Sequence, residues 1–149
     1  MATTTEVKSA TTETKAAIIE AKAADSADSI HIYCDVDSSI EREDEIFWML
    51  YIKGSHGKMR FEFVVTEPQL HTVGDWMDLA DGKKNLLCYQ GNGGGGFTIK
   101  GSDIEFDANP SGAGGDVYLT VSLPLSLVAG PLRDVIKRAQ AEGLPFAEP

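Results

Sequence analysis

The stretch from residue 86 to residue 106, LLCYQGNGGGGFTIKGSDIEF, decides between two folds for this chain. Its glycines satisfy the spacing G-x-G-x-x-G, which in a dinucleotide-binding fold stands between a strand and a helix. That helix must begin directly after the glycines, because its N-terminus holds the pyrophosphate. Here the alternating segment Phe97-Thr98-Ile99-Lys100 follows instead, and it predicts a strand. The stretch therefore favours an antiparallel hairpin with a flexible glycine tip over a nucleotide site.

Three further strands are predicted before this hairpin, as an antiparallel meander. Residues 30–36 alternate, so that Ile30 and Ile32 point to one face while His31 and Tyr33 point to the other. Residues 46–52 form a continuous apolar run, which predicts a central strand covered on both faces. Residues 58–66 alternate again. The turn residues 54–57 would join the second and third of these strands.

Two helices are also predicted. Thr66 is a candidate N-cap, with Gln69 completing a capping box and Pro68 in the first turn, where its missing N–H is harmless. That helix would end at Gly82, since glycine adopts the left-handed cap without strain. The second helix would begin with Pro131 at its first position.

These elements predict an α+β domain over residues 29–149. An antiparallel sheet of six to seven strands, with later strands at 85–90, 97–100, 104–107 and 117–123, would carry both helices on one face. Trp48, Trp76 and Leu132 are expected to be buried. Residues 1–28 contain no aromatic side chain and predict an N-terminal arm. The arm is either a disordered tail or, since residues 11–24 hold good helix formers, a helix ordered on a neighbour.

The charge balance bears on the kind of partner. The chain has 149 residues, with 23 acidic against 13 lysine and arginine side chains and a net charge of −10. No basic stripe is present, which disfavours nucleic-acid binding, whereas an acidic surface favours a basic partner. No apolar run approaches the roughly 18 residues that span a bilayer. We therefore expect a soluble, cytoplasmic protein.

Cysteines and histidines give no cofactor site. Cys34 and Cys88 fall in apolar strand patterns and are expected to be small buried side chains, although a disulfide between them stays open. His31, His56 and His71 show neither HxH nor HExxH spacing. We therefore expect no metal ion and no cofactor.

Two groups of acidic residues are candidates for partner binding. The first is the loop 37–45. The pattern Asp35-x-Asp37-x-Ser39 at its beginning has the spacing of a calcium loop, but Ile40 replaces the glycine and Ile46 the closing glutamate. The second lies on the strand after the glycines, where alternate acidic residues share a face that either is solvated or binds a partner. The candidate residues are Asp37, Glu41, Glu43, Asp44, Glu45, Asp103, Glu105, Asp107 and Asp116.

No nucleophile elbow or phosphate loop occurs, so we expect a protein that is not an enzyme. The predicted architecture and composition resemble those of small bacterial interaction domains, including immunity proteins that neutralise toxins. The first hypothesis is thus an acidic protein–protein interaction domain of immunity or inhibitor type that binds a basic protein. The alternative is a structural subunit of a viral or cellular assembly, which self-assembles through residues 1–28 and its glycine-rich loops. An enzyme without a recognisable motif is the third.

Overall fold

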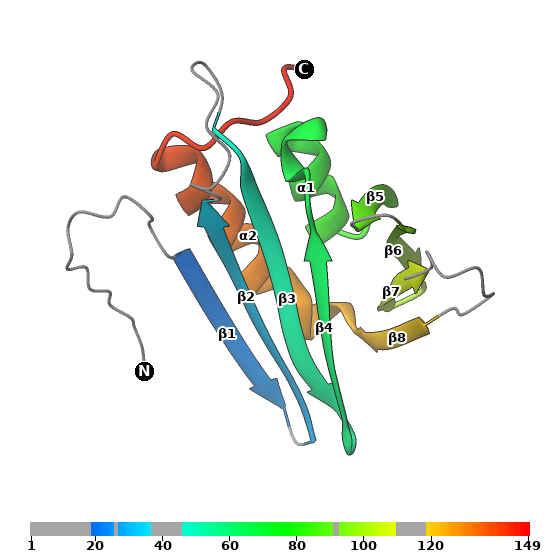
Figure 1. The fold of residues 1–149 in the computed structure, drawn as a ribbon. Helices are drawn as coiled ribbons and strands as arrows, with labels where there is room; N and C mark the ends of the chain where they lie inside the picture. The colour runs from blue at the N-terminus through cyan, green and yellow to red at the C-terminus, as the bar shows by residue number, and fades with distance from the viewer. Residues whose placement is uncertain (1–18, 26, 37–45, 91–92, 110–118) are drawn as a thin grey trace.

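The computed structural model describes residues 19–25, 27–36, 46–90, 93–109 and 119–149. Eight strands of these residues form two antiparallel sheets of four, accompanied by two α-helices (Figure 1). The first sheet has the order β1-β2-β3-β4 and the second β5-β6-β7-β8, so neighbouring strands in space are also consecutive in sequence. The predicted α+β class is confirmed, whereas the single sheet of six to seven strands is wrong.

The elements follow one another as two strand meanders, each ending in helix. The first sheet contains β1 (Ile19–Asp25), β2 (Asp28–Val36), β3 (Trp48–His56) and β4 (Met59–Val65). A 3₁₀ turn, η1 (Pro68–Leu70), and helix α1 (Val73–Ala80) then lead to the second sheet. That sheet contains β5 (Leu86–Gln90), β6 (Gly93–Lys100), β7 (Asp103–Asn109) and β8 (Leu119–Pro124), and helix α2 (Leu125–Ala141) follows directly.

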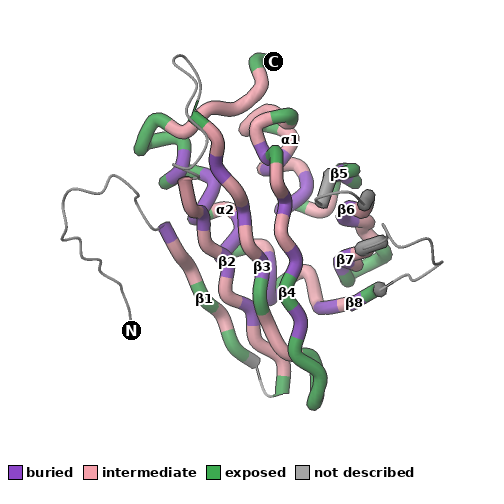
Figure 2. Tube along the Cα trace, viewed as in Figure 1, coloured by how far each residue is buried: buried purple, intermediate pink, exposed green. Residues whose placement is uncertain are grey.

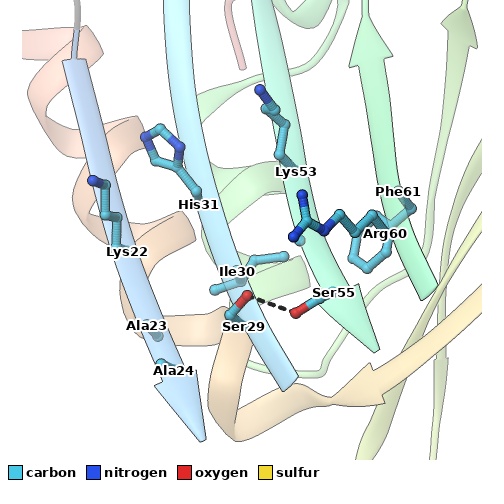
Figure 3. Close-up of a pocket in the computed structure, with 11 residues that line it drawn as sticks. Lys22, Ala23, Ala24, Ser29, Ile30, His31, Lys53, Ser55, Arg60 and Phe61 are labelled. Carbon is cyan, nitrogen blue, oxygen red and sulfur yellow. Dashed lines mark hydrogen bonds between the residues drawn. The ribbon is translucent and has the colours of Figure 1, made fainter. Parts of the chain in front are cut away.

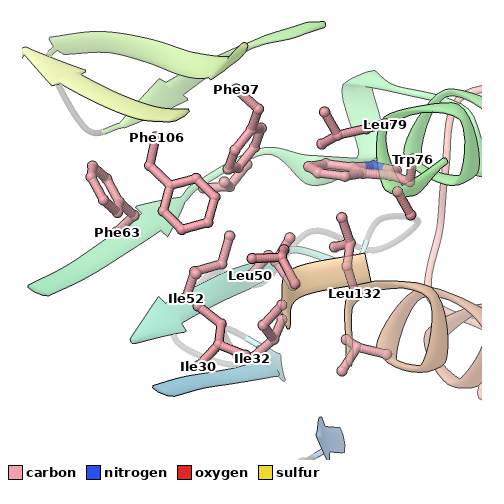
Figure 4. Packing of buried hydrophobic residues seen from close by; sticks show 14 of the residues in the cluster. Ile30, Ile32, Leu50, Ile52, Phe63, Trp76, Leu79, Phe97, Phe106 and Leu132 are labelled. Carbon is pink, nitrogen blue, oxygen red and sulfur yellow. The ribbon is translucent and has the colours of Figure 1, made fainter. Parts of the chain in front are cut away.

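The core lies on the inner face of the first sheet. Helix α2 packs against β1, β2 and α1, while the second sheet meets the first beside β4 (Figures 1 and 4). Phe61 and Phe63 on β4 lie edge-on to Phe106 on β7, with ring centroids 5.9 Å and 5.4 Å apart. Each meander has one apolar face, and burying both requires that these faces meet. Local alternation cannot distinguish two facing sheets from one longer sheet, which explains the incorrect strand count.

Residues 19–24 are strand rather than helix. Ile19 lies opposite Cys34 and is 4% exposed, and Ala21 and Ala23 pack against the core from the same face. Ile19, Ala21 and Ala23 alternate as in a strand, but the surrounding residues also favour helices, so this alternation did not predict a strand. Pairing with β2 overrides that propensity, so over residues 19–24 the chain forms neither the disordered tail nor the helix that the sequence left open. Residues 1–18 lie outside the described residues.

Strand β3 is central, as predicted, since β2 and β4 flank it. It is not covered on both faces. Trp48, Leu50 and Ile52 are buried, whereas Met49 and Tyr51 are only half-buried, and Figure 2 shows this alternation along the strand. The apolar run therefore places Met49 and Tyr51 on the outer face of the first sheet.

Helix α1 begins later than predicted. Its N-cap is Thr72, whose Oγ1 accepts a 2.9 Å hydrogen bond from the Asp75 amide, while Asp75 Oδ2 accepts one of 3.1 Å from the Thr72 amide. The capping box predicted from Thr66 is wrong, since the chain first turns through η1. This turn presents the Pro68 carbonyl to the Trp76 indole, which donates to it over 3.2 Å. Trp76 is fully buried, as predicted.

Helix α2 begins at Leu125, so the start predicted at Pro131 is wrong. The Leu125 amide donates to the Ser102 carbonyl over 2.8 Å, which fixes the helix start against the β6–β7 turn. Pro131 lies inside the helix and removes one backbone hydrogen bond. Starting earlier brings Leu127 and Val128 into the core, and this burial offsets the lost bond. Leu132 is 2% exposed, which confirms its predicted burial.

The glycine block is part of a strand. Gly93 to Gly96 belong to β6, with Gly95 opposite Cys88 and Gly96 opposite Leu87. A Cβ atom at Gly96 would lie 2.4 Å from the Leu86 carbonyl oxygen, so the two backbones approach too closely for any other residue. The predicted hairpin is confirmed, but Gly93 to Gly96 lie within its second strand and not in a flexible tip, and Gly96 serves close strand contact.

Candidate functional site

The acidic residues of β7 lie on the outer face of the second sheet. Ile104 and Phe106 point into the core and are 0% and 1% exposed, so the alternate residues Asp103, Glu105 and Asp107 point outward. Asp103 is exposed and the other two are partly exposed. The structure thus brings these three candidates together along one strand.

Two of these three carboxylates have neighbours of their own. Lys100 Nζ lies 3.7 Å from Glu105 Oε1, and its side chain is 60% exposed. The Thr120 hydroxyl donates to Asp107 Oδ1 over 2.9 Å. The lysine pair is surface-exposed and contributes little to stability. A more strongly basic partner could therefore replace Lys100 beside Glu105.

An exposed leucine lies on the same face. Leu87 on β5 is 83% exposed. In the strand register Leu87 faces Gly96, and Gly96 faces Asp107, so a glycine without a side chain separates Leu87 from the acidic strand. His71 Nε2 lies 2.7 Å from the Leu87 carbonyl oxygen and holds this segment of β5. Sequence reasoning missed Leu87, although its place next to the inward-facing Leu86 gave the signal.

The remaining acidic candidates are not placed. Asp37, Glu41, Glu43, Asp44, Glu45 and Asp116 lie outside the described residues. Whether they join the three acidic residues of β7 stays a prediction.

The histidines are separate from one another in the fold, and each lies near a carboxylate. The pairs are His31 with Glu20 (2.7 Å), His56 with Asp28 (3.2 Å) and His71 with Asp75 (3.7 Å). Across the described ranges, no three histidine, cysteine, aspartate or glutamate side chains gather in a way that could hold a metal ion.

Asp75 links the start of α1 to the segment before β5. Lys84 Nζ donates to its Oδ1 over 2.5 Å, and the Thr72 amide donates to its other oxygen. The Lys84 ammonium, followed by the Thr72 amide, holds the pKa of Asp75 below its ordinary value. The Asp75 carboxylate thus forms hydrogen bonds within the local structure and does not belong with the acidic residues of β7.

The two cysteines are free and buried, so the disulfide left open by the sequence does not form. Burial raises the pKa of Cys34 and of Cys88 to about 12. Both thiols therefore stay protonated at neutral pH, and their place in the core is that of small apolar side chains.

In the part of the chain that the structure describes, no helix has the length and apolar character needed to cross a membrane. Comparison of the sequence and the structure with family models, curated proteins and solved structures finds no significant match. The outer face of the second sheet, defined by Leu87, Asp103, Glu105 and Asp107, is the candidate site and is called the acidic face below.

Proposed function

We propose that this chain is a non-enzymatic protein–protein interaction domain of immunity or inhibitor type that binds a basic partner through the acidic face. The observation that carries the proposal is the position of Leu87, 83% exposed, on the same face as the three outward carboxylates of β7 and separated from that strand only by the glycine of β6. An apolar anchor with charged neighbours is the common anatomy of a protein–protein interface.

The two kinds of residue would act on different steps of binding. Carboxylates chiefly speed the encounter with a positively charged surface, and salt weakens this effect. The net charge of −10 extends the same attraction beyond the acidic face. Leu87 would instead slow dissociation, because its removal from water is lost when the complex separates.

Association kinetics test this proposal once a partner has been captured from a native lysate with the immobilised full chain. Asp103→Lys and Glu105→Lys are expected to lower the on-rate more than they raise the off-rate. Leu87→Ser is expected to raise the off-rate. Glu142→Lys is the matched control, since it makes the same charge change at the end of α2 (Figure 1).

The same reversal at Glu43 and Asp44 tests the loop 37–45. Binding that responds neither to salt nor to any of these substitutions would show that the acidic residues are only a solvated surface.

Light scattering of the purified chain separates this proposal from a structural subunit. A monomer or small dimer is expected for an inhibitor or adaptor. A large particle would favour the subunit, which would assemble through residues 1–28.

A further inference from the structure

The outer face of the first sheet carries one basic side chain from each of its four strands. Lys22 on β1, His31 on β2 and Lys53 on β3 lie opposite one another in the strand register. Arg60 on β4 lies in the neighbouring row, opposite Ser55. Figure 3 shows these side chains around a hollow that has a volume of about 730 Å³.

Three of these side chains have no counter-ion among the residues that the structure describes. Among the described residues, Lys22, Lys53 and Arg60 form no ion pair within 4.0 Å, although acidic side chains are in excess over the whole chain. The nearby carboxylates do not fill this role. Glu20 lies against His31, and Glu62, which faces Lys53 in the register, is not within ion-pair distance of it.

The repulsion between these basic side chains costs electrostatic free energy, and a bound anion would remove that cost. Lys22 and Lys53 lie two strands apart, one on each side of His31, and the nearby Glu20 carboxylate is taken up by His31. Like charges on one face of a sheet repel one another. In a chain of net charge −10, solubility does not require such a group of bases. The unpaired cations therefore point to a negatively charged ligand.

The floor of the hollow adds hydroxyl groups and apolar surface. Ser29 Oγ and Ser55 Oγ lie 2.9 Å apart, and either can be the donor. When Ser55 donates to Ser29, the Ser29 proton is available to a ligand. Ala23, Ala24 and Phe61 also line the hollow. Its volume falls in the range of about 300–1,000 Å³ that is usual for small-molecule sites.

We propose that this hollow binds a small organic phosphate that carries more than one phosphoryl group. β1 and β3 are separated by β2, so the backbones that carry Lys22 and Lys53 are roughly 10 Å apart at the strand spacing of sheets. A chain of two or three phosphoryl groups can reach both ammonium groups, whereas one carboxylate cannot. Arg60 supplies the planar fork that binds phosphoryl oxygens through two hydrogen bonds. The organic part would lie against Ala24, which shares the outer face with Lys22.

Calorimetric titration of the full chain with inorganic triphosphate tests this site. We expect saturable binding at one site. Lys53→Gln and Arg60→Gln should each weaken it by about tenfold, which corresponds to about 1.4 kcal/mol. Both side chains are exposed, so the fold should tolerate their replacement, and an unchanged melting temperature checks this. Lys137→Gln, on the exposed side of α2, is the matched control and should leave the affinity unchanged.

Three results would overturn the proposal. The first is the absence of saturable binding by the wild-type chain. The second is an equal loss of affinity in Lys137→Gln and Arg60→Gln, which would show general attraction to positive charge. The third is tighter binding of a hexaglutamate peptide than of triphosphate, which would assign the hollow to an acidic protein segment.

Discussion

Replacing Gly96 with alanine tests the close contact between β5 and β6. The added Cβ would lie 2.4 Å from the Leu86 carbonyl oxygen and 3.1 Å from the Leu87 Cα, and both are backbone atoms. Ordinary van der Waals contact begins near 3.4 Å, so the strands would have to separate by about 1.0 Å at this point. No side-chain rotation can relieve the contact.

The size of the effect follows from this displacement. A hydrogen bond of about 2.9 Å that lengthens by about 1 Å is effectively broken. One or two ladder bonds, each with a net value of about 0.5–1.5 kcal/mol, would be lost near Leu86 and Gly96. Alanine recovers roughly 0.4–1 kcal/mol by restricting the unfolded chain. These two terms together amount to a net loss of between about −0.5 and 2.6 kcal/mol. The strain of overpacking adds about 1–3 kcal/mol, so we expect Gly96→Ala to lower the free energy of unfolding by at least about 1 kcal/mol.

Chemical denaturation monitored by tryptophan fluorescence measures this change. Gly74→Ala is the matched control, because its added Cβ meets only the Thr72 hydroxyl at 3.6 Å, which is an ordinary contact. In helix α1 this substitution should stabilise the protein by up to about 1 kcal/mol. If Gly96→Ala is as stable as the wild type, the strands do not approach as described, and the glycines are a flexible tip after all.

Two further predictions concern the core and the cap of α1. Trp48→Ala should lower the free energy of unfolding by about 3–5 kcal/mol, because the ring is fully buried and its Nε1 donates to the Pro145 carbonyl over 2.9 Å. A loss below about 1 kcal/mol in chemical denaturation would contradict this prediction. Asp75→Asn should cost about 1 kcal/mol at pH 7, as for other lost caps. The pKa of Asp75 is lowered on folding, so its stabilisation is present above the unfolded value of about 3.9 and is lost as the pH falls through the folded value. The free energies of unfolding of the wild type and of Asp75→Asn should therefore converge in acid. A constant difference between them down to pH 2, well below the ordinary pKa of aspartate, would refute the ionic origin of this stabilisation.

Part of the candidate site could be predicted from the sequence. Asp103, Glu105 and Asp107 share a face because strand side chains alternate, and this period is visible in the sequence. The basic hollow could not be predicted in this way. Lys22, Lys53 and their neighbours come from separate strands, and only the pairing register places them side by side.

The sequence by itself determined which side chains of β2 and β4 turn toward the core. Alternation along β2 and β4 and the burial of Trp48 were readable because they depend on neighbours a few residues away. Helix starts were less readable, since Thr66 and Thr72 both offer a capping box and the burial of Trp76 selects the second.

The tertiary structure alone decided how the strands divide into two sheets. Both meanders present one apolar face, and a local pattern does not say whether such faces lie in one sheet or oppose each other. The edge-on packing of Phe63 against Phe106 belongs to the second arrangement. It leaves an outer face on each sheet, one with acidic residues and one with basic residues, because α2 and the facing sheet cover only the inner sides.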